Sequence, residues 1–457
     1  MPPDTLEQKI NITLKEIIEI TKGSFIGPAE SLDTKISTIT IDSRSHKQCD
    51  LYIAILGKEH DGNQFIEEVL NNGIKFAIIS NPIFHSQKTV LVDSGKKALA
   101  NIALFLRKQI KPKIIAITGS NGKTSTKELV VSIMKKHLGD DKILYTAGNF
   151  NNDIGLPLTL LNLKDSHSHV VLELGMSHAG EIAELTKIAN PNIALITNIG
   201  EAHIQNFKSQ DDIAEAKKEL LNNSNQLETS ILPRDDNYYQ FLAKNKKNIT
   251  QITFGFTKQA TINCEVVDTQ TIIIFTPKEN IDVKMNLLGK HNISNILAAC
   301  ACSYALDIPI KIMKEGIEAT KPFPGRLEII DSRSGAIIIN DSYNANPSSM
   351  REAVDVLVSM DGKKILVIGD MTELGNNTDR YHLELADYIK KFQIDYTLAI
   401  GNHTKVTMQR LDKNKFWFDS KKALLSKLLK IIDAKSIVLV KGSRSMKMEE
   451  LVSKIIL

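Results

Sequence analysis

Residues 118–125 read Thr-Gly-Ser-Asn-Gly-Lys-Thr-Ser and combine two glycines with a lysine and several hydroxyl side chains. They follow an apolar run at 114–118 and open a stretch with helical spacing of apolar residues at 123–137. Backbone N–H groups at such a helix start are unsatisfied, and glycines let phosphate oxygens approach them. We therefore predict a phosphate-binding loop formed by Gly119, Ser120, Asn121, Gly122, Lys123, Thr124 and Ser125.

Two residues of this loop have distinct chemical roles. Lys123 supplies a positive charge for the β and γ phosphates of a nucleotide, and the Thr124 hydroxyl can ligate Mg²⁺. The general pattern G-x-x-x-x-G-K-[ST] has a glycine where this chain has Ile117, so the match to that pattern is partial. A glycine-rich turn with an exposed lysine is the alternative interpretation.

Two further residues, Glu173 and His203, are candidates for a metal site, whereas Lys217 has no role that the residue pattern alone supports. Glu173 lies near the end of an apolar run at 169–174, and His203 follows the next run at 193–197. Both are expected at the carboxyl edge of a sheet, where ligands of open α/β folds bind. Lys217 lies in a charged helical segment. Simpler roles exist for each: a helix cap for Glu173, a structural role for His203, and a solvated surface position for Lys217.

The elements that must position these residues form a repeating pattern. From residue 113 onward, short β-branched runs alternate with segments of helical period, which is typical of βαβ units and a largely parallel sheet. The predicted strands are almost continuously apolar, which is expected when helices cover both faces of the sheet. Between 229 and 288 strand-like stretches such as 271–275 predominate, before a helix at 291–306. We predict an α/β fold centred on a P-loop-type doubly wound sheet with a β-rich part.

A second α/β series predicts a separate Rossmann-like domain. Its strands are expected at 336–340, 364–370, 396–401 and 436–442. It follows KPFPGR at 321–326, where two prolines and a glycine break any helix and make a hinge. The first hundred residues contain strand candidates at 36–41, 51–56 and 76–80. These patterns predict three domains, with bounds 1–110, 111–322 and 323–457.

Composition excludes several classes of protein. The 457 residues include 42% hydrophobic and 24% charged residues, which is the balance of a globular protein. A net charge of +4 is too small for a dedicated nucleic-acid binder. The four cysteines lack the paired spacing of a zinc site and are expected to be buried thiols. The first residues lack a signal-peptide core and no apolar run approaches about 20 residues, so we expect a soluble cytoplasmic protein.

Taken together, these motifs resemble the Mur ligases, ATP-dependent enzymes that form the amide bonds of the peptidoglycan peptide. The family's phosphate loop has the form T-G-x-x-G-K-T-S, which 118–125 matches, so the absence of the general pattern's first glycine at Ile117 is expected. By the same resemblance, Glu173 and His203 match metal positions, and Lys217 matches a lysine carried as a carbamate. The resemblance implies ATP and two Mg²⁺ ions as cofactors, a carbamylated Lys217, and Lys123, Lys217 and His203 as catalytic residues. A carbamate is an anionic oxygen donor, which Mg²⁺ prefers.

Other segments carry the resemblance along the whole chain. The segment 289–295 resembles the family's adenine-side motif, which makes Asn295 the expected contact to the base. Arg326 of the P-G-R at 324–326 is expected to contact the nucleotide phosphates, and Asp341 is expected to bind the ribose. The resemblance also implies substrate-binding residues on three segments: Ser43 and Arg44 for a uridine diphosphate, Asn149, Asn151, Asn152 and Asp153 in a substrate loop at 146–155, and Lys441 and Arg444 for a dipeptide.

The activity that this resemblance implies joins D-alanyl-D-alanine to UDP-N-acetylmuramoyl-tripeptide through an acyl phosphate, in cytoplasmic peptidoglycan precursor synthesis. We expect a monomer without nucleic-acid partners or membrane insertion, whose last domain closes over the site because acyl phosphates hydrolyse readily. Three alternatives stay open: a relative that adds another amino acid, such as the tripeptide-forming ligase or folylpolyglutamate synthetase; a nucleotide-gated switch; and a phosphotransferase. The sequence leaves open the third residue of the tripeptide, diaminopimelate or lysine, and the base that deprotonates the amine.

Overall fold

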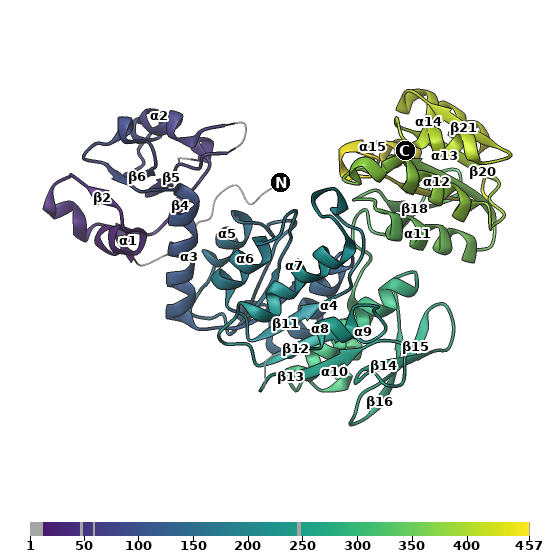
Figure 1. Cartoon of the computed structure of the whole chain (residues 1–457), viewed down its shortest axis with the longest axis horizontal. Helices are drawn as coiled ribbons and strands as arrows, with labels where there is room; N and C mark the ends of the chain where they lie inside the picture. Colours follow the sequence, from purple (N-terminus) through teal and green to yellow (C-terminus); the bar gives the residue numbers. More distant parts are fainter. Residues whose placement is uncertain (1–11, 46–48, 58–59, 245–247, 457) are drawn as a thin grey trace.

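The computed structural model describes residues 12–45, 49–57, 60–244 and 248–456. Three α/β regions follow one another along the chain, and Figure 1 shows the central region below, with the N-terminal region on the left and the C-terminal region on the right. This architecture confirms the predicted α/β fold class. Among the described residues, no helix is both long enough and apolar enough to span a bilayer.

The central region is built on a six-stranded sheet in which every neighbouring pair is parallel. The strand order is β13-β12-β11-β8-β10-β9. The strands are β8 (Lys113–Thr118), β9 (Ile143–Tyr145), β10 (His169–Glu173), β11 (Ile193–Ile196), β12 (Thr229–Pro233) and β13 (Thr250–Phe254). Because β8 lies between β10 and β11, the loop that follows β8 opens at the point where the chain diverges to the two sides of the sheet.

Alternating side chains of β8 fill two separate cores. Ile114 and Ala116 pack on one face of the sheet, and Ile115 and Ile117 pack on the other. The first face is covered by α3 (Gly95–Ile110), α5 (Gly155–Leu160), α6 (Glu181–Ala189) and α7 (Gln210–Asn222). The second is covered by α4 (Lys123–Leu138), α9 (Lys290–Ala305) and α10 (Ile310–Ala319). Burial on both faces explains the continuous apolar runs in the sequence.

The β-rich part forms a three-stranded antiparallel sheet beside α9 and α10. Its strands are β14 (Asn263–Val266), β15 (Thr271–Phe275) and β16 (Asn280–Lys284), in the order β14-β15-β16. A short helix, α8 (Tyr239–Leu242), lies between β12 and β13 in the chain. Ile272, Ile274 and Val283 point into the same core as α4. The sheet is therefore an extension of the central region, as predicted.

The N-terminal region has a five-stranded sheet of order β2-β7-β6-β5-β4 and a separate pair, β1 and β3. The elements are β1 (Ile12–Thr13), α1 (Leu14–Thr21), β2 (Ser24–Phe25), β3 (Lys35–Ile36), β4 (Ile39–Thr40), β5 (Leu51–Ile53), α2 (Ile66–Asn71), β6 (Phe76–Ile79) and β7 (Thr89–Leu91). The prediction of one strand over 36–41 was wrong. The Asp50 carboxylate accepts hydrogen bonds from the backbone N–H groups of Ser37 and Thr38, which interrupts the strand between β3 and β4.

The C-terminal region carries the second predicted α/β series. Its sheet has the order β17-β18-β22-β19-β20-β21 and is parallel except for β17. The strands are β17 (Glu328–Asp331), β18 (Ile337–Asp341), β19 (Lys363–Gly369), β20 (Tyr396–Ile400), β21 (Lys415–Phe418) and β22 (Ser436–Lys441). The helices are α11 (Pro347–Ser359), α12 (Thr378–Ile389), α13 (Thr404–Arg410), α14 (Lys421–Ile431) and α15 (Glu449–Ile455). Two apolar cores, one on each face, support this sheet.

Candidate active site

The loop between β8 and α4 requires glycine at two positions. The backbone angle φ is +151° at Gly119 and +78° at Gly122. A Cβ atom at Gly119 would lie 1.8 Å from the Thr197 hydroxyl oxygen, and one at Gly122 would lie 2.2 Å from the Asn295 amide oxygen. The loop therefore packs closely on its neighbours and leads into the 16-residue helix α4, whose N-terminus faces a large cavity.

Lys123 is the first residue of α4 and lines this cavity. Its ammonium donates hydrogen bonds to the carbonyl oxygens of Gly119, at 2.7 Å, and Ser120, at 3.3 Å. Burial lowers the pKa of Lys123 below its ordinary value, and the Glu173 carboxylate partly offsets this effect. The cation is thus held against the loop that we predict to bind phosphate.

Thr124 and Glu173 lie in direct contact, as expected for two ligands of one metal ion. The Thr124 hydroxyl donates a hydrogen bond of 2.8 Å to the Glu173 carboxylate, whose other oxygen accepts one of 2.7 Å from the Asn151 amide. Arg326 also donates to the Thr124 oxygen, at 3.1 Å. Glu173 is only 3% exposed. A hydroxyl oxygen and a carboxylate, the donor types that Mg²⁺ prefers, therefore meet at the end of β10.

The other two expected metal residues are placed differently. His203 lines the same cavity, but its Nδ1 atom lies 2.8 Å from the carboxylate of Glu373 in the C-terminal region. The neighbouring His203 ring holds the pKa of Glu373 below its ordinary value. Lys217 is buried in α7, and burial, together with the nearby Lys123 charge, holds its pKa well below its ordinary value. Within the described parts of the chain, no three His, Cys, Asp or Glu side chains form a ready metal cluster.

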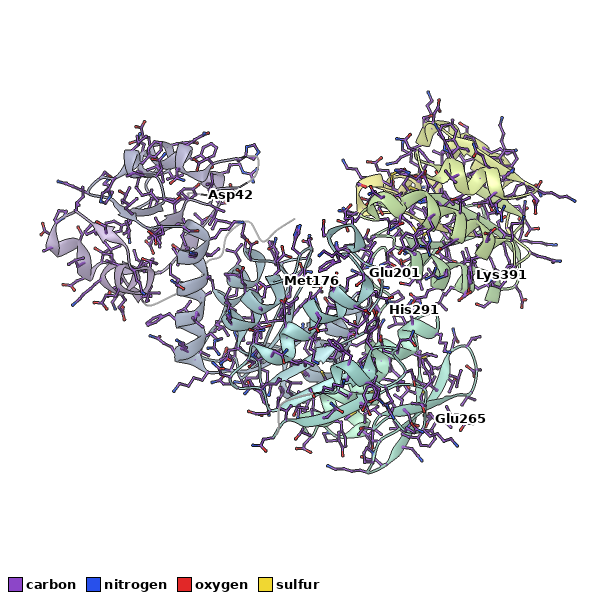
Figure 2. The ribbon with its side chains drawn as sticks, in the orientation of Figure 1. Asp42, Met176, Glu201, Glu265, His291 and Lys391 are labelled. Atoms are coloured by element: carbon purple, nitrogen blue, oxygen red, sulfur yellow. The ribbon has the colours of Figure 1, made fainter. Side chains whose placement is uncertain are left out.

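The cavity has a volume of about 1540 Å³ and takes residues from all three regions. Figure 2 shows Glu201 and His291 on the side of the central region that borders the C-terminal region. Besides the phosphate loop, the cavity lining includes the predicted residues Asn149, Asn151, Asn152, Asp153, Glu173, His203, Asn295, Arg326, Asp341 and Lys441. Most of the residues predicted separately along the sequence therefore share one space.

Asn295 is buried beneath the phosphate loop. Its amide oxygen accepts a hydrogen bond of 3.3 Å from the Thr126 hydroxyl, and its amide nitrogen donates one of 3.0 Å to Asn292. Both ends of the amide are thus occupied by α4 and α9. In this arrangement Asn295 supports the loop from behind while it borders the cavity.

The C-terminal region contributes a buried ion pair. Lys441 Nζ lies 2.6 Å from the Asp341 carboxylate, and both side chains are largely buried. Burial raises the pKa of Asp341, and the Lys441 charge opposes this increase. Arg326 stacks on the Tyr343 ring at 4.2 Å from its centroid. The stacked arginine brings the C-terminal region to the hydroxyl of Thr124.

A second pair of ionisable groups joins the central and C-terminal regions. His291 Nδ1, at the start of α9, lies 3.9 Å from the carboxylate of Glu352 on α11. Burial raises the pKa of Glu352 to about 7 and lowers that of His291 to about 4. Lys441 lowers both values through its charge. Each group is therefore shifted toward its neutral form.

The phosphate loop itself bonds to the C-terminal region. The Asn121 amide nitrogen donates a hydrogen bond of 2.7 Å to the Ser348 hydroxyl, and its oxygen accepts one of 2.6 Å from the Asn346 amide. Asn346 also caps α11 by accepting a hydrogen bond from the backbone of Ser349. One helix end therefore engages both polar ends of the Asn121 side chain.

The loop at 146–155 lies on the side of the cavity nearest the N-terminal region. Asp153 pairs with Lys96 of α3 at 2.8 Å, and the Asn152 side chain accepts a hydrogen bond of 2.8 Å from the backbone of Gly155 at the start of α5. Three predicted substrate residues lie elsewhere. Ser43, Arg44 and Arg444 are not among the described residues that line the cavity. Arg44 forms an ion pair with Asp42, and Arg444 forms one with Glu449.

Several residues of the cavity escaped prediction from sequence. Lys97, Arg351 and Glu352 line it, yet each lies in an ordinary charged helical segment. Glu373 belongs to the segment 369–375, which resembles one typical of the family member that adds D-alanyl-D-alanine, but sequence gives Glu373 itself no role. Its contact with His203 joins positions 170 residues apart. For Lys97, Arg351 and Glu352 the available signal was a helical position soon after a strand, which many surface residues share.

Comparison with protein families matches three successive segments. Residues 35–106 match the Mur ligase family catalytic domain, residues 117–303 match the Mur ligase middle domain, and residues 325–444 match the Mur ligase glutamate ligase domain. The matches cover each of the three α/β regions.

Curated relatives match the chain over almost its whole length. The chain is 37% identical to the UDP-N-acetylmuramoyl-tripeptide--D-alanyl-D-alanine ligase of Buchnera aphidicola from Acyrthosiphon pisum, with 98% of both chains covered. It is 34% identical to the Escherichia coli protein of the same name, with 97% of this chain and 98% of that protein covered. The Bacillus subtilis protein of that name is also 34% identical, with 98% and 99% covered.

Solved structures match the arrangement of the regions. A crystal structure of MurF from Acinetobacter baumannii superposes with a TM-score of 0.91 at 30% identity, and the match covers 98% of this chain and 99% of that one. MurF ligase from Thermotoga maritima in complex with ADP gives a TM-score of 0.83 at 26% identity, with 91% and 96% covered. Sequence, fold and site geometry agree, and we conclude that this chain belongs to the Mur ligase family.

Proposed function

We propose that this chain is the ATP-dependent ligase that joins D-alanyl-D-alanine to UDP-N-acetylmuramoyl-tripeptide, forming ADP and phosphate. Full-length relatives from Buchnera, Escherichia coli and Bacillus subtilis carry the name of that activity. The observation that carries the proposal in this chain is the contact between Thr124 and Glu173 at the start of α4, where the Glu173 charge also acts on Lys123. A ligase that uses ATP needs a site of this kind, and the neighbouring loop at 146–155 supplies polar side chains for the acid.

The chemistry explains why the site is arranged in this way. A carboxylate resists attack by an amine because its leaving group would be oxide, so the γ phosphoryl group is first transferred to it. Phosphate then leaves when the amine of D-alanyl-D-alanine attacks the acyl phosphate. We assign to Lys123 and Arg326 the stabilisation of the phosphoryl oxygens during transfer, which their positive charges beside the loop at 118–125 support. Water must be excluded at this stage, because an acyl phosphate hydrolyses readily.

We propose that Thr124, Glu173, His203 and Lys217 hold two Mg²⁺ ions. The contact between the Thr124 hydroxyl and the Glu173 carboxylate supports this assignment, because both supply hard oxygen donors. Mg²⁺ would supply charge neutralisation at the phosphate oxygens. His203 would bind Mg²⁺ from the far side of the cavity, where its ring also contacts the Glu373 carboxylate.

Lys217 fits the carbamate that the family resemblance implies. A neutral amine adds CO₂ to give a carbamate anion and one released proton. Burial and the Lys123 charge both favour the neutral amine at Lys217. The resulting carbamate would reverse the charge of the side chain close to Lys123, which turns a repulsion into an attraction.

We assign the two substrates to opposite sides of the cavity. Asn149, Asn151, Asn152 and Asp153 would seat the tripeptide nucleotide, with Ser43 and Arg44 at its uridine diphosphate. Lys441 and Arg444 would bind the dipeptide from the C-terminal region. Arg44 and Arg444 are highly exposed, so both assignments require the outer regions to move toward the centre. The turn at 321–326 would serve as the hinge, with domain bounds at 110 and 322.

A cavity lined by three regions of one chain supports a protein that works as a monomer, and we place the reaction in the cytoplasm, where ATP is available.

The test of the proposed activity is the mass of the product formed from ATP, D-alanyl-D-alanine and each tripeptide nucleotide, one with diaminopimelate and one with lysine. The expected product has the mass of nucleotide plus dipeptide minus one water, with one ADP and one free phosphate released. A stable phosphorylated product would identify a phosphotransferase. ATP hydrolysis that needs neither substrate would identify a switch, and a product with another amino acid would identify a different ligase.

A further inference from the structure

Lys127 is a buried lysine that the proposed chemistry leaves unused. It lies one helical turn after Lys123 on α4, and its side chain is 0% exposed. A charged ammonium is costly to bury unless it is paired and hydrogen-bonded. Lys127 meets this requirement with two short contacts: it donates to the backbone carbonyl of Thr146 at 2.6 Å and lies 2.6 Å from the carboxylate of Glu128.

Thr146 is the first residue of the loop at 146–155 and also a neighbour of the metal site. Its backbone N–H donates to the carbonyl of Val171 on β10. Its hydroxyl accepts a hydrogen bond of 3.0 Å from the backbone N–H of Glu173. With its carbonyl bound by Lys127, all the polar groups of Thr146 are engaged. Thr146 is therefore fixed between α4 and β10.

The same loop is anchored a second time further along the chain. The backbone N–H of Gly175 donates to the carbonyl of Asn151, and the Asn151 amide donates to the carboxylate of Glu173. Between these two anchors lies Asn149, which borders the cavity. Loss of Lys127 would remove one of the three hydrogen bonds that hold Thr146 and leave the Asn151 anchor in place.

We propose that Lys127 is a positioning residue for the tripeptide nucleotide. By holding the carbonyl of Thr146, it ties the helix that carries the phosphate loop to the loop that seats the acid substrate. The acid and the γ phosphate must meet at a fixed distance, and Lys127 joins the two segments that carry them. This inference rests on the proposed function, since it assigns the loop at 146–155 to the nucleotide substrate.

The test uses Lys127→Met, which keeps most of the apolar volume and removes the ammonium. We expect KM for the tripeptide nucleotide to rise about tenfold or more while KM for ATP changes by less than about twofold, because binding of one substrate is lost. Amide hydrogen exchange in 146–155 should accelerate. If this variant does not fold, Lys127→Gln is measured in its place; its side chain is neutral and shorter, and the same split between the two KM values is expected.

Two matched controls separate positioning from stability. Lys136→Met makes the same exchange at an exposed site of α4 and should leave both KM values unchanged. Ile133→Ala destabilises the buried face of α4 without touching Thr146, and it should lower the Tm while the ratio of the two KM values stays at that of the wild type.

Equal changes in both KM values for Lys127→Met, or no change in either, would overturn the inference. The same result for Ile133→Ala as for Lys127→Met would overturn it too, because general destabilisation would then explain the effect. Failure of the proposed function looks different: the wild-type chain itself would form no ligated product in the same assay.

Discussion

Asp341 and Lys441 face each other from the neighbouring parallel strands β18 and β22, with 2.6 Å between their charged atoms. The family resemblance gives them separate duties, the ribose for Asp341 and the dipeptide for Lys441. The structure makes them one buried pair, with Lys441 also donating to the carbonyl of Asn344 at 2.9 Å. A change at either residue therefore acts on both the nucleotide side and the dipeptide side of the cavity.

Lys441→Met should lower the free energy of unfolding by about 3–5 kcal/mol, because it leaves the Asp341 carboxylate buried without its partner. The double variant Asp341→Asn with Lys441→Met should recover most of that loss. Urea unfolding of the full chain measures both. If the double variant is as unstable as the single variant, the pair does not act as a unit.

Lys123→Met should lower kcat by about 10²–10³-fold, since it removes a charge that stabilises the phosphoryl group in transfer. Release of ADP in the presence of both substrates measures the rate. Lys136→Met on the same helix is the control and should retain full activity. An undiminished rate for Lys123→Met would place the triphosphate elsewhere.

Glu173→Gln should raise the Mg²⁺ concentration needed for half-maximal activity by at least about tenfold. Glutamine keeps one oxygen that can accept the hydrogen bond from Thr124, while its NH2 group replaces the oxygen that accepts from the Asn151 amide. A Mg²⁺ titration at saturating ATP gives the measurement. An unchanged titration midpoint would remove Glu173 from the metal site.

Protein prepared with ¹³C-bicarbonate should show a carbamate carbon signal by NMR that Lys217→Met lacks. We expect this signal because burial lowers the pKa of Lys217 and so favours the neutral amine, which is the form that adds CO₂. Lys218→Met, at the next position of α7, serves as the control and should keep the signal. If Lys217→Met keeps the signal while the Lys218 variant loses it, the assignment is wrong.

Glu352 and His291 should give the stability a pH dependence with two opposing parts. The folded-state pKa of Glu352 is raised from 4.5 to about 7, so the folded state binds more protons in that window and the free energy of unfolding falls as pH rises through it. The folded-state pKa of His291 is lowered from 6.5 to about 4, so the unfolded state binds more protons between those values. The His291 contribution to the free energy of unfolding therefore rises with pH in that window.

Urea unfolding between pH 4 and 7 separates the two contributions. Glu352→Gln should make the stability rise more steeply with pH, and His291→Asn should make it fall more steeply. Asp341, Arg351, Asp355 and Lys441 also act on these groups and stay unchanged in both variants. Parallel curves for the wild type and Glu352→Gln would show that this carboxyl titrates normally.

The fold was largely predictable because local pattern and burial agree. The run at 114–118 is apolar at every position except its last, since both faces of β8 are covered, and the glycines of the phosphate loop mark its end. The strand at 36–41 was not predicted correctly, because Asp50 interrupts it from a distance in the chain. The residue pattern within 36–41 cannot indicate a hydrogen bond to a side chain outside that segment.

The site was predictable where a motif carried the chemistry and unpredictable where tertiary contact decided it. Thr124 and Glu173 meet because Thr124 follows β8 and Glu173 ends β10, and these parallel strands end at the same edge. The pairing of Asp341 with Lys441 depends on the register of two strands 100 residues apart. Likewise, Lys127 reads as an ordinary helical lysine until its carbonyl partner on Thr146 is known.

The two hydrogen bonds on the Asn121 side chain both come from the start of α11. Any rotation that moves α11 away from the phosphate loop breaks both hydrogen bonds together. The two bonds therefore form and break as one unit. A motion that opened the C-terminal region would therefore also separate the loop at 118–125 from α11.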